Sequence, residues 1–244
     1  MVSYLKAKLF SWRRINVVLF TDIPRPEKLK VSLYKEEQLI KKETAHFTSI
    51  NNIYIFDINL DKDYELGKNY RLLVGDLQCT NIDVNDAIYF KDFDERFFYE
   101  KEDLGSNYTK EATEFVMWAP LASEVKVKLI SPKDEVIIRE MVREDKGIYR
   151  LKINEDLLNY KYRYIINNSG VVTEAKDLYG KEVSLNSEYS VVIDTESLLK
   201  IKNVKPETTI NNYVDAVIYE THIRDLNEGN YNNTVNKGKF AGFA

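Results

Sequence analysis

A glutamate, a histidine and an aspartate stand close together near the end of the 244-residue sequence, at Glu220, His222 and Asp225. Such side chains can form a catalytic set or bind a metal ion, so their spacing raises both possibilities. We expect residues 215–223 to form a strand, on which Glu220 and His222 point to the same face. Two ligands are too few for a defined metal site, and one strand cannot fix the mutual geometry of a catalytic set. The sequence therefore predicts neither a catalytic residue nor a metal site here.

Aromatic side chains are the other groups that could bind a ligand, because a flat ring stacks on the apolar face of a sugar. Trp118 is one such ring, and it lies in a strand-like motif beside Pro120. Tyr149 and Tyr162 are further candidates, and both lie in predicted strands. Aromatic rings also pack well inside β-sheet proteins, so a core position is the favoured alternative for all three. Any ligand binding by these residues is expected to be weak.

The elements that would position these side chains are predicted to be strands. Short runs of β-branched and aromatic residues alternate with polar or turn residues, and no long amphipathic helical pattern precedes residue 155. Such spacing is typical of a β-sandwich. The first four runs are Ile15–Thr21, Leu29–Tyr34, Asn52–Ile58 and Tyr70–Val74. We assign them to an N-terminal sandwich-like domain, residues 1–100.

A second sandwich is predicted for residues 101–195. A charged stretch precedes it, and a turn is expected near its start, at residues 103–107. Val125, Val127 and Leu129 alternate with lysines, as in a half-buried strand. Gly147 is expected at a turn between the predicted strands 135–141 and 148–153. Residues 196–213 are predicted to be a linker, and residues 214–244 begin with the predicted strand at 215–223. The fold class is therefore all-β, with two consecutive sandwich domains.

Composition excludes several classes of partner. The formal net charge is −4 without a basic stripe, so nucleic acid is a poor candidate. Cys79 is the only cysteine, which excludes an internal disulfide and a cysteine zinc site. The apolar run Asn16–Phe20 is too short to cross a membrane or to form the core of a signal peptide, so we expect no membrane partner and a cytoplasmic location.

Three motifs follow one another in the second half of the sequence. They are DLGSNYT at 103–109 with TEFVMWAP at 113–120; DLYGKEV at 177–183 with Asn186 and VVID at 191–194; and DAVIYETHIRD at 215–225 with NKGKF at 236–240. Together they resemble the type I pullulanases, debranching enzymes of glycoside hydrolase family 13. The first two motifs are similar to the opening and the exit of a carbohydrate-binding module of family 48. The third is similar to the first strand of the catalytic barrel. Leu178 and Gly180 depart from the family pattern, which has proline and alanine there.

This resemblance implies an immunoglobulin-like fold for residues 101–195 and a truncated first strand of a (β/α)₈ barrel in residues 214–244. It makes Tyr219 and His222 candidates for the substrate side of that barrel. The family's parent activity is hydrolysis of α-1,6-glucosidic branches in glycogen, starch or pullulan, without a cofactor. The barrel needs about 250 residues and collects its catalytic carboxylates from several strands, whereas 30 residues run from Asp215 to Ala244. We therefore expect the chain alone to be inactive.

Three functional hypotheses remain open. The leading one is the non-catalytic N-terminal part of a pullulanase-like enzyme, with weak binding of α-glucans such as glycogen, starch or maltooligosaccharides. The second is a free-standing glucan-binding module. The third is a fragment that docks a separately encoded catalytic barrel domain, which the predicted unpaired strand at 215–223 would favour because a bare strand edge invites pairing.

Overall fold

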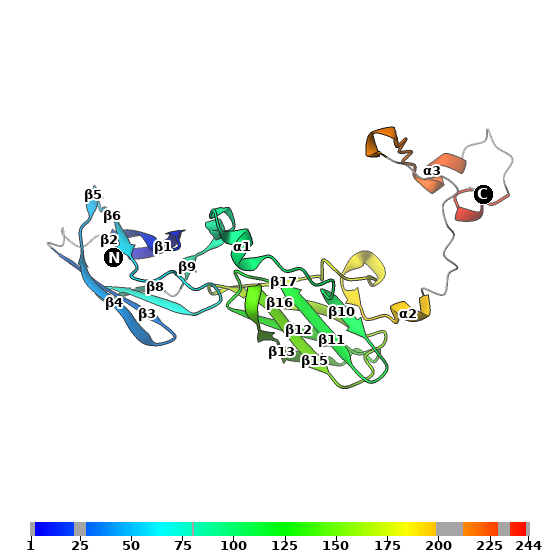
Figure 1. Cartoon of the computed structure of the whole chain (residues 1–244), viewed down its shortest axis with the longest axis horizontal. Coiled ribbons are helices and arrows are strands. Elements are labelled where there is room, and N and C mark those ends of the chain that lie inside the picture. Colours follow the sequence, from blue (N-terminus) through cyan, green and yellow to red (C-terminus); the bar gives the residue numbers. More distant parts are fainter. Residues whose placement is uncertain (1–2, 22–27, 80, 199–211, 229–234, 243–244) are drawn as a thin grey trace. The chain divides into compact units, whose positions relative to one another are not determined.

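Four β-sheets make up most of the structure, a computed structural model that describes residues 3–21, 28–79, 81–198, 212–228 and 235–242. Contacts divide the chain into two compact units, residues 1–200 and 201–244, which are described separately. All four sheets lie in the first unit (Figure 1). The predominance of β-structure predicted from the sequence is thereby confirmed.

Two sheets form the first β domain. One has the order β5-β6-β2-β1-β9 and the other β4-β3-β7-β8. Their strands are β1 (Ser3–Ser11), β2 (Arg14–Thr21), β3 (Leu29–Lys35), β4 (Gln38–Ala45), β5 (Thr48–Ile50), β6 (Ile53–Asn59), β7 (Tyr70–Val74), β8 (Leu77–Cys79) and β9 (Ile82–Asp83).

One hydrophobic cluster, the first core, lies between these sheets. Leu9 and Ile15 enter it from one sheet, and Val31 and Leu33 enter it from the other. Along β2, buried residues alternate with half-buried ones, because successive side chains of a strand point to opposite faces. This arrangement is consistent with a sandwich. The four strands predicted near Ile15, Leu29, Asn52 and Tyr70 all form.

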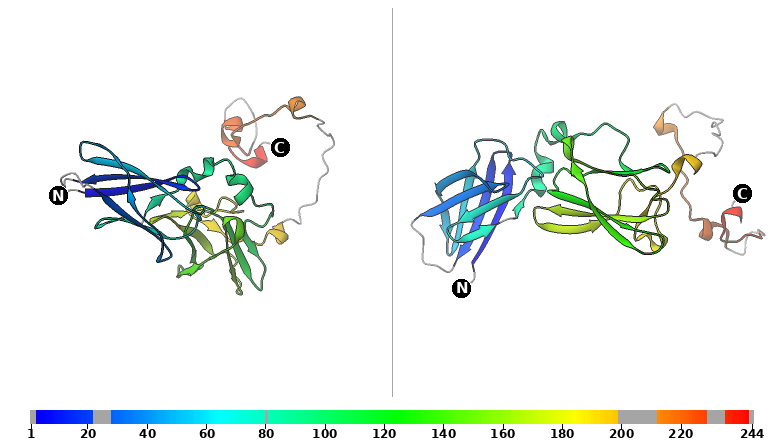
Figure 2. Two further views of the ribbon diagram at one scale, coloured as in Figure 1. Left: turned by 60° about the vertical axis from the view of Figure 1, so that its left-hand side comes forward. Right: turned by 90° about the horizontal axis from the view of Figure 1, so that it is seen from below.

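The other two sheets form the second β domain and face each other (Figure 2). Their orders are β10-β11-β15-β14 and β13-β12-β16-β17, with β18 also paired to β16. The strands are β10 (Gly105–Tyr108), β11 (Thr113–Trp118), β12 (Glu124–Ile130), β13 (Val136–Glu140), β14 (Val142–Arg143), β15 (Ile148–Ile153), β16 (Lys161–Asn168), β17 (Val171–Ala175) and β18 (Ser190–Val191).

The second core lies between these two sheets. Phe115 and Tyr149 enter it from one sheet, and Val127 and Tyr162 enter it from the other. The predicted turn at Gly147 is present, with a φ of +73° that suits glycine. The turn predicted at residues 103–107 is partly wrong, since β10 begins at Gly105 and pairs with β11. Turn-forming residues are held in a strand there by the neighbouring strand.

Helices are short. They are α1 (Phe93–Phe97), α2 (Thr195–Leu198) and α3 (Ile223–Asn227), with the 3₁₀ turns η1 (Asn85–Tyr89), η2 (Asp145–Gly147), η3 (Leu185–Ser187), η4 (Tyr213–Asp215) and η5 (Phe240–Gly242). In the part of the chain that the structure describes, no helix is long and apolar enough to span a membrane. Most of the predicted linker, including Pro206, falls on residues 199–211, outside the described residues.

The strand predicted at residues 215–223 is wrong. That stretch contains the end of η4, an irregular segment over residues 216–222, and the first residue of α3. A strand forms where its backbone groups pair with a neighbour. Residues 212–228 and 235–242 contribute no strand to which this segment could pair. Its apolar side chains consequently face solvent, with Val217 95% and Ile218 89% exposed.

Candidate functional site

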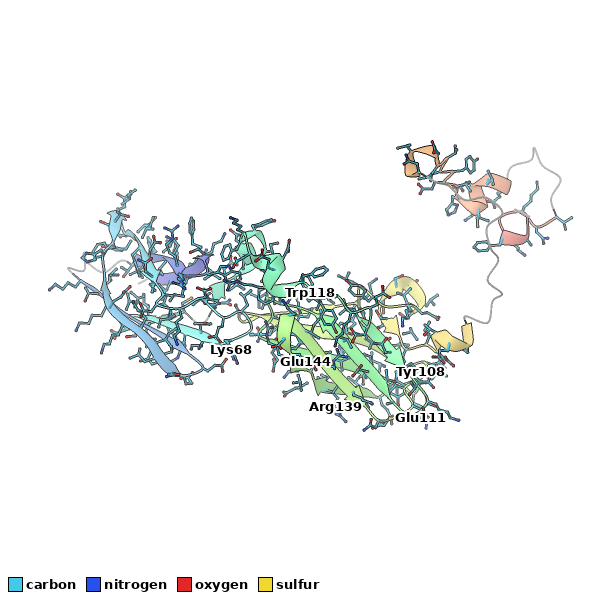
Figure 3. The ribbon with its side chains drawn as sticks, viewed as in Figure 1. Lys68, Tyr108, Glu111, Trp118, Arg139 and Glu144 are labelled. Atoms are coloured by element: carbon cyan, nitrogen blue, oxygen red, sulfur yellow. The ribbon has the colours of Figure 1, made fainter. Side chains whose placement is uncertain are left out.

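The outer face of the β10-β11-β15-β14 sheet carries the residues most suited to contact a ligand. On β11, Phe115 and Met117 pack against the second core, so Glu114 and Trp118 point to the opposite face. On β15, Arg150 alternates in the same way with core residues. In Figure 3, Trp118 lies at one end of the β10–β11 pair and Tyr108 at the other. We call this surface the outer face.

Trp118 does not occupy the core position that the sequence favoured. Its side chain is 40% exposed. The indole Nε1 donates a hydrogen bond to the backbone oxygen of Phe97, 2.9 Å away. The next residue, Phe98, is 63% exposed. The end of β11 therefore presents an indole ring that is held at its polar edge and is partly open to solvent.

Arg150 is the charged centre of the outer face. Its guanidinium forms ion pairs with Glu114 at 2.9 Å, Asp103 at 3.0 Å and Glu144 at 3.2 Å. Burial opposes the charge, but the hydrogen bonds that the guanidinium donates to Asp103 and Glu144 outweigh it and raise the pKa of Arg150. Burial also opposes ionisation of Asp103, yet hydrogen bonds from Tyr99 and Arg150 lower the pKa of that carboxyl.

These ion pairs give the outer face a fixed polar rim. Arg150 also donates to the hydroxyl of Tyr99 at 3.1 Å, which in turn donates to Asp103 at 2.7 Å. The segment that precedes β10 is thereby attached to β15. Nothing in the sequence singled out Arg150, because the three carboxylates come from separate segments that only the fold brings together.

Tyr149 and Tyr162, the other aromatic candidates of this domain, lie in the second core and are essentially unexposed. The Tyr149 hydroxyl donates to the backbone oxygen of Ala122 at 2.7 Å. Their rings leave no face open for stacking, in keeping with the core position that the sequence favoured.

Asp177 anchors a network of buried hydroxyl groups at the edge of the second core. Its carboxylate accepts hydrogen bonds from Tyr162 at 2.8 Å and from Tyr164 at 3.2 Å. Tyr162 also bonds to the hydroxyl of Ser106 at 3.2 Å. Burial and the nearby negative charge of Asp177 raise the pKa of both tyrosines well above the ordinary value. Asp177 belongs to the second sequence motif, but the motif did not indicate this role.

Tyr219 and His222 belong to the second compact unit. Tyr219 is exposed in the irregular segment. His222 precedes α3, and its Nδ1 lies 3.3 Å from a carboxylate oxygen of Asp225. No group of three or more histidine, cysteine, aspartate or glutamate side chains in the described residues could hold a metal ion. The role of both residues on the substrate side of a barrel stays a prediction.

Comparison with known proteins assigns the second β domain to a family. Residues 103–194 match the family of carbohydrate-binding module 48, the isoamylase N-terminal domain. The chain is 32% identical over 213 residues to a pullulanase of Bacillus subtilis, an alignment that covers 81% of this chain and 29% of that protein.

Solved structures extend this similarity to the first domain. A pullulanase from an Anoxybacillus species in complex with maltotriose is 28% identical, with a TM-score of 0.83 over 98% of this chain and 34% of that one. The type I pullulanase of B. subtilis with maltose gives 29% identity and a TM-score of 0.81, over 99% and 33%. The chain thus spans about a third of the length of these relatives. Its residues 103–194 are a carbohydrate-binding module 48 domain, and the chain as a whole is similar to the N-terminal region of the pullulanases.

Proposed function

We propose that residues 103–194 bind α-glucan through the outer face, within a protein of the pullulanase type that cleaves α-1,6-glucosidic branches. The observation that carries the proposal is the partly exposed ring of Trp118 on the outer face, which it shares with Arg150. A pyranose has an apolar face and polar edges, so an aromatic surface with charged groups at its rim suits it. Arg150, with Glu114 and Glu144, supplies such groups.

The relatives support the chemical class of this ligand. Two of the similar pullulanases were solved with maltotriose and with maltose. The domain family is itself named for carbohydrate binding. Since only part of Trp118 is open to solvent, we expect weak binding to maltooligosaccharides and stronger binding to long chains. We propose no catalytic role for residues 103–194.

Replacing Trp118 tests this proposal. Trp118→Ala should weaken maltotriose binding by at least about tenfold, which corresponds to roughly 1.4 kcal/mol of stacking. Trp118→Phe keeps a stacking ring and loses the hydrogen bond to Phe97, so it should retain most of the affinity. Isothermal titration calorimetry of the three proteins gives the comparison, with circular dichroism to show that each is folded.

The matched control is Phe10→Ala, which removes an exposed ring from strand β1 of the first domain. It should leave the affinity unchanged. Equal binding by Trp118→Ala and the unaltered protein would rule out the outer face as the site. A binding loss in Phe10→Ala instead would place the site on the first domain.

Docking to a catalytic domain is a second candidate role, favoured by the exposure of Val217 and Ile218. Neighbouring apolar side chains that are exposed at a surface mark an interaction site. We expect the 244-residue protein to self-associate as its concentration rises, and a protein ending at residue 213 to stay monomeric. Sedimentation velocity over a concentration series measures both. Identical behaviour of the two proteins would count against docking through this segment.

A further inference from the structure

The first contact between the two β domains involves Arg143 of the module and Gly67 of the first domain. The guanidinium of Arg143 donates to the backbone oxygens of Ala122 at 2.9 Å and Pro120 at 3.0 Å, and it lies 3.2 Å from the Tyr149 hydroxyl. Gly67 packs directly against this group, so that a Cβ atom at residue 67 would overlap it. Because its hydrogen bonds fix the guanidinium, it cannot move aside without losing several of them.

The second contact consists of hydrogen bonds that the module donates to helix α1. Lys146 donates to the backbone oxygen of Glu95 at 2.9 Å, and Trp118 donates to that of Phe97 at 2.9 Å. The last carbonyl groups of a helix lack partners within the helix. Two side chains of the module thus provide the hydrogen bonds that the end of α1 needs.

Helix α1 is itself part of the first domain. Phe93 is buried in the first core and Phe97 packs against it. Arg96 forms ion pairs with Asp63 at 2.7 Å and Asp92 at 2.6 Å, and Asp92 also accepts a hydrogen bond from Trp12. The helix is therefore fixed to the first domain by packing and charge, and to the module by Lys146 and Trp118.

A third contact is apolar. Leu121, in the module loop between β11 and β12, packs against the first core, although it belongs to the sequence of the second domain. Domains within one chain usually move relative to each other unless their interface is large and apolar. Here the two domains are held together by the Arg143 guanidinium, by the hydrogen bonds to the two carbonyl groups of α1, and by Leu121.

We propose that the module surface formed by Trp118, Leu121, Arg143 and Lys146 is a docking surface for the first domain. It joins the two domains into one rigid body, so that the outer face does not turn independently of the first domain. Trp118 then has a structural task through its N–H group as well as any ligand contact through its ring. This inference does not depend on whether the outer face binds glucan.

Two glycine substitutions test the rigid body. Gly67 and Gly75 both lie in the first domain with positive φ, +82° and +57°. Alanine strains the backbone at either position. Only at Gly67 does the new methyl group meet Arg143, because nothing lies within 4 Å of a Cβ at Gly75. Gly67→Ala should therefore separate the domains, and Gly75→Ala should not.

Nitrogen relaxation by NMR on the 244-residue protein gives the rotational correlation time of each domain. We expect one shared value in the unaltered protein and in Gly75→Ala, and two different values in Gly67→Ala. Different values in the unaltered protein would overturn the proposal. So would a shared value in folded Gly67→Ala.

A second pair of variants covers the case in which Gly67→Ala does not fold. Lys146→Met removes the ammonium group from an exposed residue, and Lys133→Met does the same at an exposed turn of the module. Lys146→Met should give the two domains different correlation times, and Lys133→Met should leave them with one shared value. Equal correlation times in both lysine variants would overturn the role of the α1 contact.

Discussion

Replacing Asp177 by alanine should lower the free energy of unfolding of the module by about 2–4 kcal/mol, because two buried hydroxyl donors lose their acceptor. Tyr164 would lose its hydrogen bond to the carboxylate, and Tyr162 would keep only its contacts with Ser106 and Ser190. The backbone of Asp177 also donates to the Ser190 hydroxyl at 3.1 Å, and its carboxylate accepts from the Tyr179 amide at 2.9 Å. The substitution therefore loosens the segment that leads from β17 to β18 as well. Urea unfolding followed by circular dichroism measures the loss.

Two comparisons isolate the role of the carboxylate. Asp177→Asn keeps one acceptor oxygen, so it should cost less than Asp177→Ala. Glu111→Ala changes an exposed acidic residue on the β10–β11 hairpin (Figure 3) and should lie within about 0.5 kcal/mol of the unaltered protein. A loss in Asp177→Ala no larger than that in Glu111→Ala would show that water replaces the carboxylate.

At alkaline pH the protein should unfold cooperatively rather than titrate gradually. Burial raises the pKa of Tyr70 to about 12, and it raises the pKa of Tyr64, Tyr149, Tyr162 and Tyr164 as well. In the unfolded chain these phenols ionise near pH 10, whereas in the folded protein they keep their protons. Their contribution to stability is complete below about pH 10 and is lost as the pH rises towards the folded pKa values.

The effect is large because several groups act together. Each buried tyrosine lowers the free energy of unfolding by roughly 1.4 kcal/mol per pH unit above pH 10, so the three in the module lower it by roughly 4 kcal/mol per unit. We expect the phenolate absorbance of the buried tyrosines and the far-UV circular dichroism to change together in one step between about pH 11 and 13.

The comparison for this titration is Tyr164→Phe, which should reduce the proton release of the step by one group in the module. This substitution also removes one hydrogen bond to Asp177 and so changes the stability of the module. The number of protons released, and not the pH midpoint of unfolding, is therefore the quantity to compare. Ionisation of the buried tyrosines near pH 10 with the circular dichroism unchanged would contradict the expected coupling.

Strands were predictable where alternation was clear and where a partner exists. Tyr70–Val74 and Ile148–Ile153 form with the expected bounds, because their apolar residues alternate and face a core. β1 and β4 were missed, since lysines and short polar residues interrupt their patterns. The segment 215–223 has an equally strong pattern and is not a strand. The local pattern shows that a segment is able to form a strand. Whether the strand forms depends on a partner strand elsewhere in the chain.

The candidate site was less accessible from the sequence. Trp118 was identified by its residue type, but its exposure depends on a hydrogen bond to Phe97 in another domain. Arg150 and Asp177 gain their importance from partners up to 51 and 15 residues away along the chain. Such contacts depend on how the two sheets stack. The alternation of apolar and polar residues predicts that the sheets stack, but not which side chains then meet.

Cys79 offers a way to observe the first domain directly. It is the only cysteine in the sequence, and it is buried at the end of β8. A thiol reagent can reach it only when that domain opens, so the labelling rate without denaturant reports the population of open molecules. The labelling rate of Cys79 therefore measures how often the first domain opens. The measurement needs no engineered cysteine that could disturb the domain.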